Sequence, residues 1–307
     1  MLFIFTRANV DVEGILTRVR QSNPWLLLLA FVAFYATFPI RALRWRMMLQ
    51  SAGRGRSKVF VLPSLAGLSE IIFLSWFANC IVPAKLGDAY RGYLLKAESG
   101  MSFSRTIGTI LAERIIDVVL LFGLMVAAAS LSFGRALPTE VVVLMQVGFA
   151  LVVVVVIGLV ALRNLRPLVH RLLPVRLHTQ YRRFEEGTLH SFRRLPLLIL
   201  LSLGAWGGEV ARLYLVTAAL GVGSVFPSVV LFVALASALA TTLPITPAGL
   251  GFAESAIVGI FILAANAGLA PGVDEHTAAS IALLDRTISY WSIIVVGAIV
   301  YALSKRR

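Results

Sequence analysis

Charged residues are scarce in this sequence of 307 residues. They make up 14% of it, whereas hydrophobic residues make up 59%. Soluble domains have about 25% charged residues, so the composition excludes a soluble globular protein. The sequence has one cysteine, Cys80, and four histidines, which excludes an intramolecular disulfide framework and leaves no residue set for a metal centre. We therefore expect a polytopic membrane protein with no metal and no cofactor.

The net charge of +13 fits either a nucleic-acid-binding surface or a membrane topology signal. The Lys and Arg residues cluster in blocks at 41–58, 85–105, 163–194 and 305–307, and none occurs at 221–227 or 267–276. This is the positive-inside pattern. It predicts a multi-pass protein of the inner (plasma) membrane with the basic blocks and the C-terminus in the cytoplasm. No polar domain is left to read nucleic acid, so we expect no such partner.

Five apolar stretches are candidates for membrane spans, which need about 20 residues each. They are residues 25–40, 106–133, 141–162, 196–220 and 277–303. Two further apolar stretches, 59–82 and 226–265, contain Pro and Gly where a span should be continuous. Because lipid leaves no backbone group unpaired, we predict an all-α protein in which these two form broken, re-entrant hairpins. The charge pattern places the first hairpin on the cytoplasmic side and the second on the outer side.

The start of the sequence differs from the rest. Residues 6–21 mix apolar and charged side chains, which is typical of an interfacial helix. We therefore expect an outer-face start before the first span. Residues 1–5 are too short for a signal-peptide core, and the alternative is that they are the remnant of an upstream helix.

An internal repeat connects the two hairpins. The pattern Pro-Ala-x-Leu-Gly occurs at 83–87 and again at 247–251, at the break of each hairpin. Each break is preceded by an arginine and followed by an acid and then an acid–arginine pair; these are Arg44, Asp88 and Glu113-Arg114 in the first copy, and Arg212, Glu254 and Asp285-Arg286 in the second. The charge pattern gives the copies opposite orientations, so we predict an inverted repeat. The alternative is that low-complexity apolar sequence generates the matches.

The repeat defines one domain, 1–307. Repeat one covers about 24–165, a cytoplasmic basic loop about 163–195, and repeat two about 196–303.

Nine charged residues lie within or against the apolar stretches, where a central charge costs about 2.5–3.5 kcal/mol. They are Glu70, Glu113, Arg114, Asp117, Glu209, Arg212, Glu254, Asp285 and Arg286. Glu113 and Asp117 share a helix face, and Arg114 projects about 100° away, so it needs a partner on another helix. Glu209 and Arg212 can pair within their own helix. Such charges either lock helices together or line a polar cavity that accepts a charged head group or protons.

The two breaks also indicate where an anion could bind. Their Pro and Gly residues remove backbone donors or permit a bend, and the helix that restarts after each break presents free N–H groups to an anion; these residues are Pro83, Gly87, Pro244, Pro247, Gly249 and Gly251. Asp88 can instead cap the restarting helix, and Asn79 can satisfy freed carbonyls. In that case Arg91 and Lys85 meet the anion. Glu70 is either a cavity wall or a hairpin tether.

Taken together, the motifs resemble a known family. They are Arg44-Trp45, Asn79-x3-Pro83-x3-Gly87-Asp88-x2-Arg91, Glu113-Arg114-x2-Asp117 and Leu243-Pro244-x2-Pro247-x-Gly249-Leu250-Gly251-x2-Glu254. From about Arg7 onward the sequence is similar to the lysylphosphatidylglycerol synthase transmembrane, or flippase-like, family, which includes the membrane half of MprF, YbhN-type proteins and AglD. The resemblance implies movement of a phospholipid, a glycolipid or an isoprenoid lipid across the bilayer. MprF-type proteins add an aminoacyl-transferase domain that this sequence lacks, so we expect no synthase activity.

We therefore expect a lipid translocase rather than an enzyme. Its head-group cavity is lined by Arg91, Glu113, Arg114, Asp117, Glu254 and Arg286, with arginines holding phosphate. The expected partner is a membrane lipid, either an anionic phospholipid or a lipid-linked sugar. One alternative is a lipid-modifying membrane enzyme, although the sequence offers no nucleophile or metal cluster for it. Another is a non-transporting partner of a separate lipid synthase.

Overall fold

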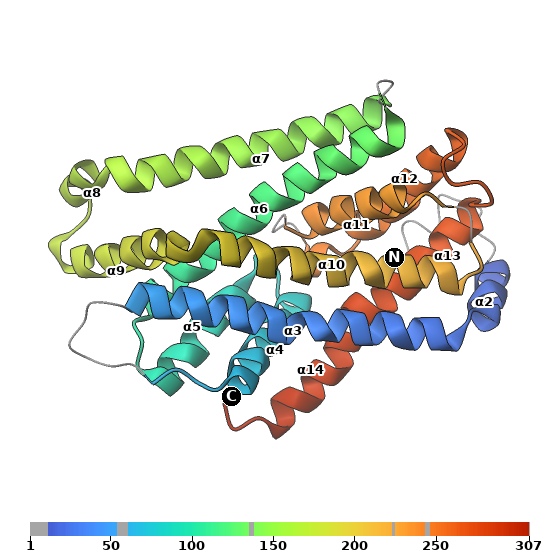
Figure 1. The fold of residues 1–307 in the computed structure, drawn as a ribbon. Coiled ribbons are helices and arrows are strands. Elements are labelled where there is room, and N and C mark those ends of the chain that lie inside the picture. The colour runs from blue at the N-terminus through green and yellow to red at the C-terminus, as the bar shows by residue number, and fades with distance from the viewer. Residues whose placement is uncertain (1–11, 54–60, 135–137, 223–224, 243–245, 307) are drawn as a thin grey trace.

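A computed structural model describes residues 12–53, 61–134, 138–222, 225–242 and 246–306 (Figure 1). The regular structure of these residues is helical, as predicted. Among the described residues, six segments are long and apolar enough to cross a membrane. They are α3 (Pro24–Gly53), α6 (Phe103–Phe133), α7 (Thr139–Asn164), α9 with α10 (Val175–Ala219), η2 with α12 (Pro247–Asn266), and α13 to α14 (Glu275–Leu303).

The other helices are shorter. They are α2 (Val12–Gln21), α4 (Leu65–Ile81), α5 (Leu86–Ser99), α8 (Arg166–Leu172) and α11 (Pro227–Thr242). Helix α2 covers the later part of the predicted interfacial helix, and residues 6–11 lie outside the described residues. The last span contains a π-helical segment, η3 (Thr287–Trp291), between α13 (Glu275–Arg286) and α14 (Ser292–Leu303).

Helices α3 and α10 (Leu195–Ala219) form a long antiparallel pair through the middle of the molecule (Figure 1). Gly208 permits their close approach, because a β-carbon there would lie 2.6 Å from Thr37 Cγ2. The predicted end of the first span at residue 40 is wrong, since α3 continues to Gly53. Arg41 and Arg44 lie buried inside it and pair with carboxylates, so their charges do not force the helix out of the apolar interior.

The α11–α12 hairpin opens beside the N-terminal end of α3. The Asn23 amide donates to the Ala219 carbonyl at 2.8 Å, which places the end of α10 at this point. The Phe226 amide donates to the Leu269 carbonyl at 3.4 Å, so the residues that enter and leave the hairpin meet. Helix α11 begins directly after Phe226, and α12 (Phe252–Asn266) ends shortly before Leu269.

The α4–α5 hairpin opens at the other end of α3. Helix α3 has 30 residues, so its two ends lie about 45 Å apart. Gly53 lies against Met101, which follows α5. Arg306 bridges Glu98 near the end of α5, at 2.6 Å, and Glu70 near the start of α4. The two hairpins therefore open toward opposite ends of α3. That they enter opposite leaflets as re-entrant segments stays a prediction.

Both predicted breaks are present, and their backbones match. Helix α4 ends at Ile81 and α5 begins at Leu86, while the second break contains the 3₁₀ turn η2 (Pro247–Gly249); Pro244 lies outside the described residues. In the first break Ala84 and Lys85 have φ of 60° and 53°, and in the second Ala248 and Gly249 have φ of 45° and 70°. Each copy of Pro-Ala-x-Leu-Gly therefore has two consecutive left-handed residues at its centre.

The segment 163–195, expected as a basic loop, is largely helical. It forms α8, α9 (Val175–Ser191) and the 3₁₀ turn η1 (Phe192–Arg194). Helix α9 packs tightly on α6, because β-carbons at Gly108 and Gly187 would lie 2.2 Å from the carbonyl oxygens of Phe184 and Arg105. This helix is thus part of the packed structure.

Replacing Gly87 with alanine is expected to destabilise the first hairpin. A β-carbon there would lie 2.1 Å from the Ser75 carbonyl oxygen and 2.6 Å from Asn79 Oδ1. Overpacking of this kind costs about 1–3 kcal/mol, so Gly87→Ala lowers the free energy of unfolding of the solubilised protein in a denaturant titration. Gly123→Ala is the control, because nothing lies within 4 Å of that position. Equal stabilities for the two variants would contradict the close packing of α5 on α4.

Candidate functional site

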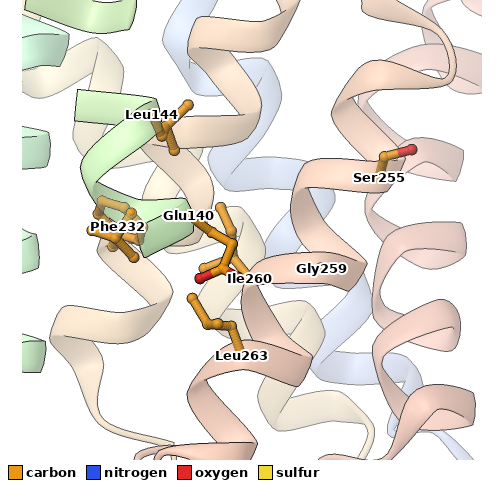
Figure 2. A pocket seen from close by; sticks show the side chains of 8 residues that line it. Glu140, Leu144, Phe232, Ser255, Gly259, Ile260 and Leu263 are labelled. Carbon is orange, nitrogen blue, oxygen red and sulfur yellow. The ribbon is translucent and has the colours of Figure 1, made fainter. Parts of the chain in front are cut away.

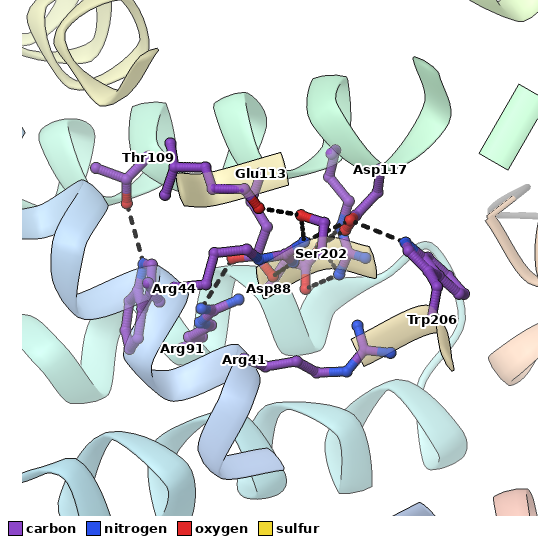
Figure 3. A network of polar contacts seen from close by, with 12 residues as sticks. Arg41, Arg44, Asp88, Arg91, Thr109, Glu113, Asp117, Ser202 and Trp206 are labelled. Carbon is purple, nitrogen blue, oxygen red and sulfur yellow. Dashed lines mark hydrogen bonds and ion pairs between the residues drawn. The ribbon is translucent and has the colours of Figure 1, made fainter. Parts of the chain in front are cut away.

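Arg44 organises a buried group of polar side chains in the first half of the chain (Figure 3). Its Nη1 donates to Asp117 Oδ1 at 2.6 Å and to the Ser202 hydroxyl at 2.6 Å. Its Nη2 donates to Glu113 Oε1 at 2.8 Å and to Asp117 Oδ2 at 3.1 Å. Glu113 and Asp117 share one face of α6, as predicted, and Ser202 belongs to α10. One guanidinium therefore joins α3, α6 and α10.

Arg91 approaches the same carboxylates from α5. Its Nη2 lies 3.0 Å from Glu113 Oε2, and its guanidinium stacks over the Trp45 ring at 3.8 Å. The Trp45 indole in turn donates to the Thr109 hydroxyl at 3.1 Å. Stacking on an aromatic face is a favourable setting for a desolvated guanidinium. Arg91 is therefore anchored on both sides within the protein.

Arg114 finds its partner on another helix, as its projection predicted. Its Nε and Nη2 donate to Asp88 at the start of α5, over 2.9–3.2 Å. The predicted capping roles are wrong. Asp88 accepts from Arg114 and makes no cap to α5, while Asn79 Oδ1 accepts from the Gly87 backbone N–H at 2.8 Å and does not serve a carbonyl. The reason is the close packing of the break on α4, which brings the Asn79 amide to the first turn of α5.

The second half has a corresponding set of pairs. Arg212 on α10 donates to both oxygens of Asp285 on α13, at 2.8 and 3.2 Å, and to Glu209 in its own helix at 2.6 Å. Arg286 on α13 donates to Glu254 at 2.8 Å. Glu254 also accepts the Gly251 backbone N–H at 2.6 Å, so it caps α12 directly after the break.

The two halves repeat the same plan of ion pairs. In each half an arginine of the first helix pairs with an aspartate of the charged helix, Arg44 with Asp117 and Arg212 with Asp285, and both partners stand 73 residues apart. In each half the arginine of the charged helix pairs with the acid that follows the break. These contacts agree with an internal repeat, whose inverted orientation in the membrane stays a prediction.

Arg41 links the halves, and sequence reasoning missed it. Its Nη2 donates to Glu209 Oε1 at 3.0 Å, and its guanidinium lies 4.8 Å from the Trp76 ring and 5.3 Å from that of Trp206. We counted Arg41 and Arg44 in a basic block assigned to the cytoplasm, whereas in the structure both are buried and paired with carboxylates. A signal was present, because Arg41 and Arg44 have the same three-residue spacing as Glu209 and Arg212.

The predicted site has a buried part, which we call the sealed part, and a partly exposed part, which we call the reachable edge. The side chains of Arg44, Glu113 and Asp117 are 0%, 4% and 3% exposed, whereas those of Arg114 and Asp88 are 29% and 18% exposed. Arg286 and Glu254 in the second half are also buried. In this conformation the reachable pair lies at the first break. That all these residues line one cavity stays a prediction.

Glu70 lies apart from these pairs. It accepts from Arg306 and from the Ser304 hydroxyl, the latter at 2.6 Å. These contacts hold the end of α14 against the start of α4. Of the two roles considered for Glu70, the structure therefore supports the tether.

An apolar cavity of about 210 Å³ lies elsewhere, between α7, α11 and α12 (Figure 2). Its wall includes Leu144, Phe232 and Ile260, with Glu140 at the start of α7. None of these residues belongs to the ion pairs described above. Among the residues that the structure describes, no group of three or more His, Cys, Asp or Glu could hold a metal ion.

Comparison with known proteins identifies the family. A family model described as lysylphosphatidylglycerol synthase TM region matches residues 1–297. The chain belongs to this family. A UPF0104 membrane protein of Methanocaldococcus jannaschii is 34% identical over 234 residues, which cover 75% of this chain and 95% of the relative. A UPF0104 membrane protein of Pyrococcus horikoshii is 26% identical over 319 aligned positions, covering 94% and 90%.

A third relative matches this chain over a short part of its length. Glycosyltransferase AglD of Haloferax volcanii is 27% identical over 115 residues, which cover 38% of this chain and 17% of AglD. The similarity to AglD thus concerns a small part of that protein. The resemblance expected from the motifs is confirmed, and the chain is a multi-pass member of the lysylphosphatidylglycerol synthase TM region family.

Arg44→Gln is expected to lower the free energy of unfolding by about 3–5 kcal/mol, because it leaves Glu113 and Asp117 without their shared partner. Arg18→Gln is the matched control: Arg18 pairs with Asp274 at 2.9 Å on the surface, where a pair contributes at most about 1 kcal/mol. A denaturant titration of both variants in detergent measures the difference. Equal losses would show that Arg44 does not hold α3, α6 and α10 together.

Proposed function

We propose that this protein is a lipid translocase of the inner (plasma) membrane. It moves the head group of a phospholipid, glycolipid or isoprenoid-linked lipid across the bilayer between two inverted, re-entrant hairpins. In this proposal α8, α9 and the C-terminus face the cytoplasm, as the positive-inside pattern favours. The protein performs no covalent chemistry on the lipid.

The observation that carries the proposal is the exposure of the Arg114–Asp88 pair. Charged pairs between the apolar spans that serve stability alone are expected to be sealed, as Arg44 is with Asp117. Arg114 instead sits beside a helix break with its guanidinium partly accessible. A guanidinium binds phosphate by two parallel hydrogen bonds. In the proposed cycle, Arg114 exchanges the Asp88 carboxylate for the phosphate of an incoming lipid.

Contacts between the two halves support a path from one break to the other. The Tyr290 hydroxyl, in the π-helical segment η3, donates to the Cys80 carbonyl near the first break at 3.1 Å. The Arg286 guanidinium lies 5.0 Å from the Tyr290 ring, and η2 of the second break packs against α4. Short π-helical segments are frequent at functional sites. In the proposed cycle, Arg286 at the second break is the next guanidinium to bind a head group released by Arg114.

A second candidate function is a non-transporting partner of a separate lipid synthase. The observation that favours it is the set of exposed arginines on α8 and α9. They include Arg176, and also Arg166 and Arg182, which pair with Glu185 and Glu186. They form a basic surface suited to anionic lipid or to an acidic partner. A lipid-modifying enzyme is the less favoured third candidate.

Arg114→Gln is expected to reduce transport at least about tenfold without loss of folded protein, because a bidentate charged contact to phosphate is removed. Transport is measured in proteoliposomes as the loss of quencher-protected signal from fluorescent phosphatidylglycerol, phosphatidylcholine and aminoacylated lipid. Arg306→Gln is the matched control, since Arg306 is a similarly exposed arginine in the surface pairs with Glu98 and Glu70.

Each outcome of this assay selects a function. Transport that is lost in the Arg114 variant and kept in the Arg306 variant supports translocation through the first break. Wild-type rates in both variants would contradict the role of Arg114. Absence of transport in the folded wild-type protein would contradict translocation and favour the partner function.

A further inference from the structure

Lys85 is a cation at the first break. It precedes α5 and is half-buried, and it makes no ion pair or side-chain hydrogen bond with the residues that the structure describes. Its carbonyl accepts the Asp88 backbone N–H at 3.0 Å, and the Asp88 carboxylate pairs with Arg114 at 2.9 Å. Arg91, the other residue that we expected to meet an anion, is buried against Glu113 and Trp45. Lys85 is therefore the available one of the two.

The charges around this break do not cancel. In the sealed part, two arginines, Arg44 and Arg91, face two carboxylates, Glu113 and Asp117. At the reachable edge, two cations share the single carboxylate of Asp88. With both cations protonated, the edge has one positive charge in excess, and an unpaired charge is costly in a setting of low dielectric. A ligand with one negative charge would neutralise it.

The two breaks differ in the residue that occupies this backbone position. Lys85 has a φ of 53°, in the left-handed region that favours glycine, and the matching residue of the second break is Gly249 with a φ of 70°. A non-glycine residue in this region costs about 1–2 kcal/mol. At the second break no side chain fits, because a β-carbon on Gly249 would lie 2.8 Å from Thr241 Cα. The first break has room for a side chain, and a lysine is present there despite the strain.

Two backbone donors at the start of α5 are already used. The Gly87 N–H is taken by Asn79 Oδ1 at 2.8 Å, and the Asp88 N–H by the Lys85 carbonyl at 3.0 Å. We therefore consider the side chains at this break as the groups that recognise an anion.

We propose that Lys85 and Arg114 form a phosphate subsite that selects lipids with a net negative head group over zwitterionic ones. The subsite belongs to the first hairpin and has no counterpart at the second, where glycine replaces the lysine. Its part in transport rests on the proposed translocase function, whereas its preference in binding does not. Lys85 acts as a specificity-determining residue: it favours the anion, while Arg114 holds the phosphate common to both lipid classes.

The binding test uses detergent-solubilised protein and short-chain lipids. Affinity for dihexanoyl phosphatidylglycerol is expected to fall about tenfold in Lys85→Gly, the equivalent of one charge-assisted hydrogen bond. Affinity for dihexanoyl phosphatidylcholine is expected to fall less, because its choline cation offsets the attraction between Lys85 and the phosphate. Lys85→Arg keeps the charge and the preference. Lys96→Ala, which removes an exposed charge elsewhere on α5, behaves as wild type.

Loss of fold cannot account for the expected result. Lys85→Gly relieves the backbone strain, so its melting temperature is expected to equal or exceed that of wild type. Unchanged phosphatidylglycerol affinity in this variant would overturn the subsite. Competition by inorganic phosphate as strong as that by phosphatidylglycerol would overturn its assignment to a lipid.

A transport measurement distinguishes failure of the Lys85 subsite from failure of the translocase function. If the wild-type protein moves lipid and Lys85→Gly loses the preference for phosphatidylglycerol over phosphatidylcholine, both stand. If transport occurs with an unchanged preference, the role of Lys85 is overturned and the translocase function stands. If no lipid moves but binding shows the Lys85-dependent preference, the subsite stands and the translocase function is overturned.

Discussion

Pairing of buried arginines with carboxylates is the constraint on which the helix arrangement depends. A charge in an apolar interior needs an opposite charge close by, and here the partners belong to different helices. Arg44 ties α3 to α6, Arg212 ties α10 to α13, and Arg41 ties α3 to α10. Because removal of one partner leaves a buried charge, each pair fixes the position of the helices that supply it. The antiparallel α3–α10 pair at the centre follows from these contacts together with close packing at Gly208.

The two breaks differ in how far their ion pairs are exposed. Both copies of Pro-Ala-x-Leu-Gly bend through two left-handed residues, yet their surroundings differ. The second break is crowded by Thr241 and its pair, Arg286 with Glu254, is sealed. The first break leaves Arg114 and Asp88 partly accessible beside Lys85. In our account the repeat supplies two similar half-sites, and this asymmetry distinguishes the side on which an anionic head group is first bound.

The features that follow from periodicity and charge were predictable from the sequence, whereas those that follow from close contact were not. Helices α7 and α10 match their predicted spans within two residues, because each is a long and mostly apolar run. The end of α3 was predicted too early, because an arginine with a carboxylate partner on a distant helix looks in the sequence like one that faces water. The role of Asn79 depends on contact between α4 and Gly87, which no local pattern reveals.

Cysteine accessibility in intact cells tests the opposed hairpins most directly. Cys80 is buried, so the wild-type background is low. Single cysteines are introduced at exposed positions near the hairpin openings, Lys96→Cys on α5 and Asn266→Cys on α12, and are treated with a membrane-impermeant maleimide. The account predicts that Asn266→Cys is labelled from outside, and that Lys96→Cys is labelled only after the membrane is opened. Labelling of both from the same side would contradict the inverted arrangement.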